Sequence, residues 1–123
     1  MLMFNLDNFG ICTGRISAIK TFVNSDNSKT VRFTVATQNA FTSSDGSRGG
    51  QFLPFTDFIP ANSKSSIYDL LGKGDRVSVE YAIFNNNFTD ADGVQHYDLS
   101  LRVDTIKFAE TRAAREYRHE HAA

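Results

Sequence analysis

Apolar and polar residues alternate most regularly between Lys73 and Phe108. The first run of alternating apolar positions comprises Val77, Val79, Tyr81 and Ile83. The second run comprises Tyr97, Leu99, Leu101 and Val103. A polar turn that ends at Asp92-Gly93 separates the two runs. A period of two is typical of strands with one buried face, and Asp-Gly favours a tight turn. The stretch therefore predicts a long antiparallel hairpin.

The other face of this hairpin carries two aromatic residues, Phe84 and Phe88, with Asn86 between them. If the odd positions cover a core, these even positions face solvent or a ligand. In the second run the apolar parity reverses after Val103. One extra residue produces such a reversal, so we expect a β-bulge near Asp104. The exposed aromatic pair is the first indication of a binding function.

Three strands are expected before the hairpin. The same alternation places them at Phe9–Ile19, from Val31 towards Phe41, and at Gln51–Ile59. Gly10 and Gly14 in the first strand permit strong bending or the close approach of another backbone. Between the second and third strands lies a polar, glycine-rich stretch, Thr42–Gly50, which predicts a mobile hairpin loop.

The third strand has a clear core parity, formed by Leu53, Phe55, Asp57 and Ile59. Asp57 is the awkward member of this set, because it is the only charged residue among apolar ones. Pro54 lies on the opposite parity and has no N–H to donate. We therefore expect an edge position or a bulge at Pro54.

A short helix is expected between the third strand and the hairpin. Asn62 or Ser63 can cap its start, and Gly72 suits the position after its end. The apolar face of this helix comprises Ile67, Leu70 and Leu71. Beyond the hairpin, arginines recur at helical spacing without a matching apolar stripe, at Arg112, Arg115 and Arg118. The tail is therefore expected to be a solvated helix or a disordered end.

The predicted order is three strands, one short helix and two strands. This is the chain order of the OB-fold, a small Greek-key barrel. We therefore expect a mainly all-β, five-stranded OB-fold barrel with one short helix between strands 3 and 4. The barrel is expected over residues 1–110, and the charged tail over residues 111–123.

Composition adds little to this picture. The 123 residues are 41% hydrophobic and 22% charged, which is typical of one globular domain. A net charge of -1 does not indicate nucleic-acid binding, so a phosphate binder of this composition must gather its cations on one face. The single cysteine, Cys12, forms no intrachain disulfide and is expected in the core. The sequence has no signal peptide and no apolar run of transmembrane length, which favours a reducing cytoplasmic compartment and no membrane partner.

Four motifs, in order, resemble those of the bacterial single-stranded DNA-binding protein family, including its phage and mobile-element members. They are Thr13-Gly14-Arg15-Ile16, Val31-Arg32-Phe33-Thr34-Val35-Ala36-Thr37, Lys73-Gly74-Asp75-Arg76-Val77-Ser78-Val79-Glu80, and the turn from Asn87-Phe88-Thr89-Asp90 through Asp92-Gly93 to Tyr97. Each motif alone is weak, but their order and spacing over residues 8 to 110 make the match fairly specific. The resemblance implies a non-enzymatic OB-fold protein without a cofactor. It also implies a homo-oligomer, with a tetramer ahead of a dimer, that coats single-stranded DNA in replication, recombination or repair.

The resemblance also implies where bases stack. Phe41 and Phe88 fall on stacking positions of the family, and Phe52 and Phe58 match two family aromatics spaced six apart. An alternative register aligns Asp57-Phe58-Ile59 with a common family element, but it leaves the loop to the helix too short. Together with the exposed Phe84, the expected stacking residues are Phe41, Phe52, Phe58, Phe84 and Phe88. The expected polar and phosphate contacts are Arg15, Lys20, Arg32, Thr34, Arg48, Lys73 and Asn86.

Two departures from the family stand out. The family usually offers arginines at the positions of Phe84 and Asn86, so phosphate contacts must come from elsewhere. The acidic C-terminal peptide that recruits replication and repair partners in the family is missing, because this chain ends in RAAREYRHEHAA. If replication or recombination proteins are partners, we expect them to bind by another route.

Rival interpretations of these residues stay open. In a chain with eleven phenylalanines, the aromatics also fit a core or a subunit interface, and the protein would then be an OB-fold interaction module. Asp90-x-Asp92-Gly93 superficially resembles the start of a calcium loop, but its glycine is misplaced and no glutamate closes the loop. His119-x-His121 lacks further ligands for a metal. No catalytic residue, metal site or enzymatic activity is therefore predicted.

Overall fold

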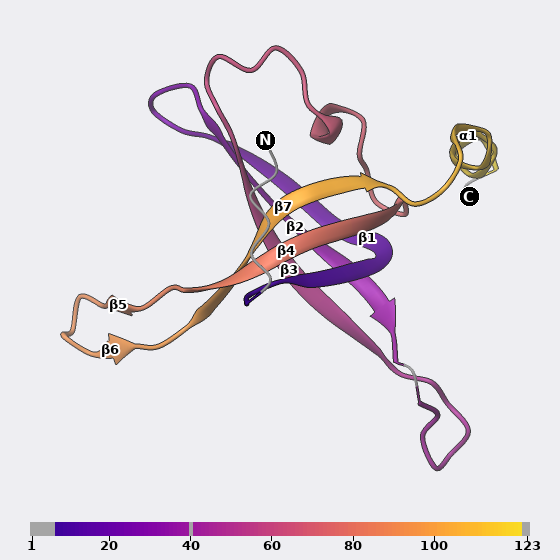
Figure 1. Cartoon of the computed structure of the whole chain (residues 1–123), viewed down its shortest axis with the longest axis horizontal. Coiled ribbons are helices and arrows are strands. Elements are labelled where there is room, and N and C mark those ends of the chain that lie inside the picture. Colours follow the sequence, from indigo (N-terminus) through magenta and orange to yellow (C-terminus); the bar gives the residue numbers. More distant parts are fainter. Residues whose placement is uncertain (1–6, 40, 122–123) are drawn as a thin grey trace.

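Five long strands close into a barrel in the computed structural model, which describes residues 7–39 and 41–121 (Figure 1). They are β1 Gly10–Val23, β2 Lys29–Gln38, β3 Gly50–Ile59, β4 Arg76–Asn85 and β7 Leu99–Phe108. The order around the barrel is β1-β2-β3-β7-β4, and β1 pairs with both β2 and β4 to close it. The contact of β3 with β7 is parallel and short, and the other pairings are antiparallel. The predicted five-stranded OB-fold barrel is confirmed.

The long hairpin is formed by β4 and β7, and its tip carries the short strands β5 Phe88–Thr89 and β6 Gln95–His96. Figure 1 shows this tip projecting well beyond the barrel. Tyr81 pairs with Val103 and Glu80 pairs with Thr105, so Asp104 is the extra residue of a β-bulge. The bulge lies where the reversal of parity predicts it.

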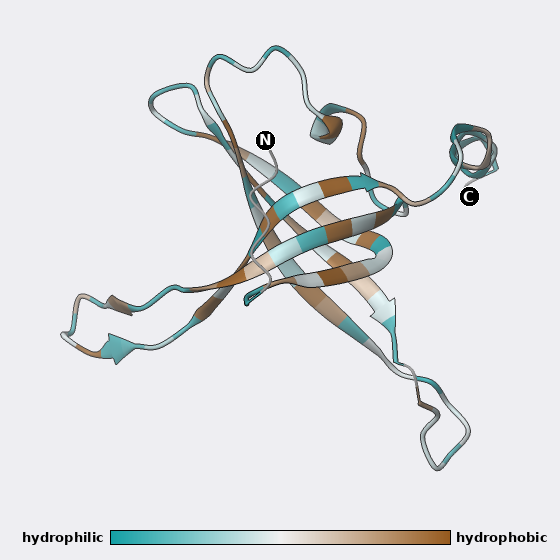
Figure 2. Ribbon diagram, in the orientation of Figure 1, coloured by the Kyte–Doolittle hydropathy of each residue, from teal (hydrophilic) through white to brown (hydrophobic). Residues whose placement is uncertain are grey.

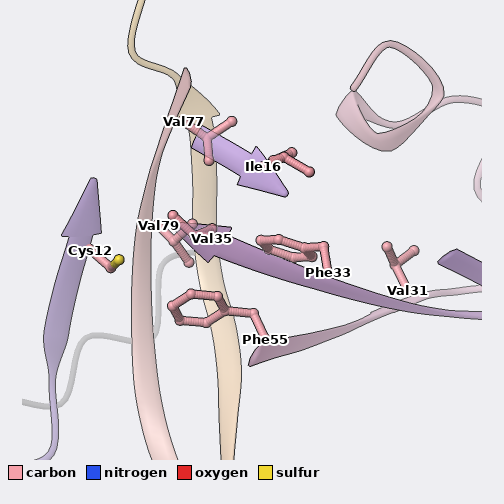
Figure 3. Packing of buried hydrophobic residues seen from close by; sticks show 8 residues of the cluster. All are labelled: Cys12, Ile16, Val31, Phe33, Val35, Phe55, Val77 and Val79. Carbon is pink, nitrogen blue, oxygen red and sulfur yellow. The ribbon is translucent and has the colours of Figure 1, made fainter. Parts of the chain in front are cut away.

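The core lies inside the barrel and follows the predicted parities (Figure 3). Its buried residues are Cys12, Ile16, Val31, Phe33, Val35, Phe55, Val77 and Val79. Phe33 stacks on Phe55 with ring centroids 5.5 Å apart. Figure 2 shows the alternation of hydrophobic and hydrophilic residues along the barrel strands. Because each buried side chain of this size contributes roughly 1.5–3 kcal/mol, this cluster is the main stabilising element.

The first strand bends through the barrel and is longer than expected, because it continues to Val23. Its register against β2 shifts between Ile16 and Ala18, so Ser17 is an extra residue. Gly14 provides the close approach predicted for it, since a Cβ there would lie 2.2 Å from the carbonyl oxygen of Ala36. The bulge and the glycine let one strand pair with β4 along its first half and with β2 along its second.

Two expectations about the strands are corrected, and one open alternative is decided. The second strand ends at Gln38, short of Phe41, because the polar loop begins there. At Pro54 the edge alternative holds and the bulge does not: Pro54 pairs with Thr34 in an uninterrupted register, and on its other side it lies just outside the two-residue ladder between β3 and β7. The apolar residues at the outer end of the hairpin do not belong to the core. The hairpin leaves the barrel there, so Ile83, Tyr97 and Leu99 are exposed.

The short helix is a single 3₁₀ turn, Ile67–Asp69, and its cap differs from the prediction. Ser66 rather than Asn62 or Ser63 caps it, because the Ser66 hydroxyl accepts from the Tyr68 N–H while Asp69 accepts from the Ser66 N–H. Leu70 remains 64% exposed, whereas the Tyr68 ring packs against the core. The left-handed glycine is not Gly72 but Gly74, at φ 95°.

The C-terminal segment forms a helix, α1 Arg112–Glu120, whose start is capped by Thr111. Two of its arginines return to the barrel: Arg118 contacts Glu110 and Asp75, and Arg115 lies over the ring of Phe108 at 4.0 Å. Asp75 is fully buried beneath them. No helix in the described part of the chain is long and apolar enough to cross a membrane.

Candidate nucleic-acid interface

A row of basic residues crosses the outer face of the barrel. Lys20 of β1 lies opposite Arg32 of β2, Arg32 lies opposite Thr56 of β3, and Thr56 lies opposite Arg102 of β7. Residues that face one another across strands share a face of the sheet, so these side chains form one line over four strands. All three cations are exposed. Within residues 7–39 and 41–121, none of them forms an ion pair with a carboxylate.

Aromatic rings flank this row of cations on both sides. Phe22 lies opposite Thr30, which lies opposite Phe58, and Phe58 is 56% exposed. At the other end Phe84 is 41% exposed, and the guanidinium of Arg102 lies 4.5 Å from its ring centroid. The ammonium of Lys20 lies 5.0 Å from the ring of Phe22. Cations and rings therefore alternate on one continuous face.

This face is hollowed into a groove. One hollow of about 350 Å³ lies between Phe58, Phe84 and Arg102. A second of about 320 Å³ shares Phe58 and Arg102 and adds Arg32 and Asn86. A third of about 370 Å³ continues along Arg32 to Lys20 and Thr34. The three hollows share residues with one another, so the groove runs from β4 across β7, β3 and β2 to β1.

Six of the residues expected to contact DNA line this groove. They are Phe58, Phe84, Lys20, Arg32, Thr34 and Asn86. Phe52 lies on the same parity of β3 as Phe58, but six residues away, and is 68% exposed. Phe41 and Arg48 lie in the exposed loop between β2 and β3, which Figure 1 shows projecting away from the barrel.

Two expected phosphate contacts lie elsewhere, beside α1. The guanidinium of Arg15 donates to the carbonyl of Gly74 at 3.0 Å and lies 3.7 Å from the carboxylate of Glu110. Lys73 directly precedes Gly74. Neither residue lines the groove between Phe84 and Lys20.

Phe88 lies at the tip of the hairpin and is 48% exposed. One face of its ring is covered by His96, with centroids 4.7 Å apart and planes 15° apart. The ring of His96 is fixed in turn by Asp90, whose carboxylate lies 2.7 Å from Nε2. The hydrogen bond with His96, together with backbone donors, lowers the pKa of Asp90. Only one face of Phe88 is therefore available to a base.

Two residues of this face were not predicted from the sequence. Arg102 lines the groove, and Phe22 lines an adjoining hollow that shares Arg32 with it. Arg102 has the same parity as Phe84 once the hairpin is folded, so the alternation of the second run already marked it as exposed. Its guanidinium lies over the ring of Phe84. Phe84 itself occupies a position at which the family resemblance implies an arginine. Phe22 lies beyond the predicted end of the first strand, but Thr21-Phe22-Val23 continues the alternation with strand-favouring residues, and that signal could have extended the strand.

Asp57, the one charged residue on the core parity of β3, lies in the wall of the groove, and its carboxylate has hydrogen-bond donors. Its carboxylate accepts from the Tyr68 hydroxyl at 2.6 Å and from the Phe58 N–H at 2.8 Å. Burial raises the pKa of Asp57, and these hydrogen bonds oppose the rise. Burial and the neighbouring Asp57 together raise the pKa of Tyr68 far above its ordinary value. The pair anchors the 3₁₀ turn to the strand that carries Phe58.

A closed five-stranded barrel with an outer groove of aromatic rings and basic residues defines the class of OB-fold domains that hold oligonucleotides. The sequence profile of the single-strand binding protein family matches residues 8–109, and the chain belongs to that family. Among solved structures, the chain is similar to Rim1, a mitochondrial single-stranded DNA binding protein of S. cerevisiae. That match has a TM-score of 0.58 and 20% identity, and it covers 84% of this chain and 95% of Rim1. At this identity the likeness concerns the fold. No curated protein sequence matches the chain significantly.

Proposed function

We propose that this protein binds and protects single-stranded DNA in the groove that runs from Phe84 to Lys20, largely without a sequence code. The observation that carries the proposal is the row of cations Lys20, Arg32 and Arg102, which lie between exposed aromatic rings and have no carboxylate partner among the described residues. This combination suits a flexible strand, because bases stack on the rings while the cations follow the phosphates. Membership of the single-strand binding protein family supports the same function.

Two forces supply the affinity in this proposal. Each base that stacks on an aromatic ring contributes roughly 1–3 kcal/mol. Each phosphate that a cation neutralises releases condensed counterions, so affinity falls with salt by a slope of about 0.7 per contact. The protein acts by binding rather than by catalysis. We assign the binding domain to residues 1–110 and leave α1 outside the groove.

A titration tests the proposal directly. Fluorescence anisotropy compares oligo-dT with a duplex of equal length at two salt concentrations. We expect tight binding of oligo-dT that weakens with salt, and little binding of the duplex. Phe58→Ala should weaken oligo-dT binding about five- to 100-fold, as expected for the loss of one stacking platform.

Tyr117→Ala is the matched control for that variant. Tyr117 is an exposed aromatic residue on α1, 64% exposed and stacked on His121, and it lies outside the groove. Its removal should leave the affinity unchanged. Absence of oligo-dT binding at low salt, or equal affinities of Phe58→Ala and the parent protein, would contradict the proposal.

We further infer that the protein assembles into a homo-oligomer, with a tetramer ahead of a dimer, and serves replication, recombination or repair in a bacterial cell, its phage or a mobile element. The exposed apolar residues of the hairpin support an assembly surface: Tyr97 is 80% exposed, Leu99 66% and Ile83 44%. The same surface is the observation that favours the second candidate function, an OB-fold module that binds other proteins. Light scattering at several concentrations tests the assembly, and a monomer mass throughout would contradict it.

A further inference from the structure

Asp104 lines the groove but has no part in the stacking and phosphate contacts proposed above. It is the extra residue of the β-bulge in β7, and its side chain is exposed. It lines the hollow of about 350 Å³ that also contains Phe58, Phe84 and Arg102. In the part of the chain that the structure describes, its carboxylate has no hydrogen-bond or ion-pair partner. Bulges often re-aim a side chain at a functional site, which makes this position informative.

A free carboxylate is poorly suited to a phosphate groove, because it repels the backbone of the strand. It is well suited to a base edge, because an ionised carboxylate only accepts hydrogen bonds. The amino group of cytosine donates to such an acceptor. Uracil and thymine present a carbonyl oxygen at the same position, and two acceptors repel one another. A carboxylate at this position would therefore favour a base whose exocyclic group donates a hydrogen bond.

The surroundings of Asp104 complete a site of suitable form. The rings of Phe58 and Phe84 border the hollow, and its volume is at the lower end of the range for small-molecule sites. The second carboxylate in its wall, Asp57, is already occupied by the Tyr68 hydroxyl and the Phe58 N–H. Of the two carboxylates in this wall, Asp104 is thus the one that remains for a ligand.

We propose that the hollow between Phe58 and Phe84 is a base-selective subsite, which prefers a base with an exocyclic amino group, and that Asp104 accepts the hydrogen bond from this group. The inference rests on the proposed function, because the base must arrive as part of a single strand. It adds a local preference to binding that is otherwise independent of sequence.

The test compares oligo-dC with oligo-dU of about 16 nucleotides at neutral pH by fluorescence anisotropy. These bases differ in the group at position 4 and in the protonation of the adjacent ring nitrogen. We expect the parent protein to bind oligo-dC about tenfold more tightly, a difference of ~1.4 kcal/mol. Asp104→Asn should bring the ratio of the two affinities close to one, because an amide both donates and accepts. Asp104→Ala should do the same without introducing a donor.

Asp92→Asn is the matched control, because Asp92 is an exposed aspartate in the hairpin turn, outside the hollow. It removes the same charge, so it should change both affinities alike and leave their ratio unchanged. The subsite is overturned if the parent protein binds oligo-dC and oligo-dU with equal affinity, or if Asp104→Asn keeps the parent's preference. In either case, binding of both oligonucleotides still supports the proposed function. Binding of neither oligonucleotide at low salt overturns both.

Discussion

Two regions of the molecule gather arginines, and they use them in opposite ways. In the groove, Arg32 and Arg102 lie beside aromatic rings with no carboxylate partner among the described residues. Beside α1, Arg115 and Arg118 converge on the buried carboxylate of Asp75, and Arg118 also pairs with Glu110. A cation that already holds a carboxylate has little to offer a phosphate. The partners of a cation, rather than its exposure, therefore decide its role.

The cluster around Asp75 has the character of a structural anchor. Asp75 is 0% exposed, and it accepts from the Gly72 N–H at 2.9 Å and lies 3.1 Å from Nε2 of His119. Burial alone would raise the pKa of Asp75, but the hydrogen bond from Gly72 and the neighbouring His119 and Arg115 outweigh it and lower the pKa. The helix α1 is thus tied to the turn that precedes β4.

The largest expected effect is the loss of this anchor. Asp75→Ala removes the carboxylate that joins α1, the Gly72 N–H and the turn. Among the described residues, Arg115 then has no carboxylate partner, and Arg118 keeps only Glu110. We expect a loss of about 3 kcal/mol in the free energy of unfolding at neutral pH, measured by urea denaturation. Glu116→Ala is the control, because its ion pair with Arg112 is exposed and should contribute less than about 0.5 kcal/mol. Equal stabilities of the two variants would mean that the cluster around Asp75 is not an anchor.

Acid should weaken the same anchor. Folding lowers the pKa of both Asp75 and Glu110. Burial alone would raise the pKa of Glu110, but the hydrogen bonds from Arg118 and from the Arg76 N–H outweigh the effect of burial. The stability that these two carboxylates contribute is therefore fully present above their unfolded pKa values of about 4. It is lost as the pH falls through their lower folded pKa values. Urea denaturation at neutral and acidic pH should show a smaller cost of Asp75→Ala in acid. A cost that stays constant with pH would contradict the ion-pair explanation.

Much of this molecule could be predicted from the alternation of its residues. The barrel, the core parities and the bulge at Asp104 follow a period of two, which depends on local backbone geometry. The arrangement of cations could not, because it depends on register between strands far apart in sequence. Lys20, Arg32 and Arg102 become neighbours only through three separate pairings. Arg15 appeared equally basic in the sequence, yet its carboxylate partner, Glu110, lies 95 residues further along the chain.

A smaller effect separates the two sets of arginines by their response to salt. Arg102→Ala should weaken oligo-dT binding about fivefold, equivalent to ~1 kcal/mol, and should reduce the salt slope by about 0.7. Arg15→Ala should leave the slope unchanged, because Arg15 already holds Gly74 and Glu110. Anisotropy titrations over a series of salt concentrations measure both slopes. A lower slope in Arg15→Ala but not in Arg102→Ala would reverse the assignment of the two regions.

The smallest expected effect concerns Phe88, which the family resemblance marks as a stacking position. His96 already covers one face of its ring, and Asp90, paired with that histidine, places a negative charge at the tip. We therefore expect Phe88→Ala to weaken oligo-dT binding by less than about fivefold, below the lower end of the base-stacking range. Phe58→Ala, measured in the same titration, provides the scale, because no ring of the described residues stacks on Phe58 and it lies beside the cations of the groove. If Phe88→Ala lost as much affinity as Phe58→Ala, the strand would extend onto the projecting hairpin. The groove on the barrel would then be only part of the binding surface.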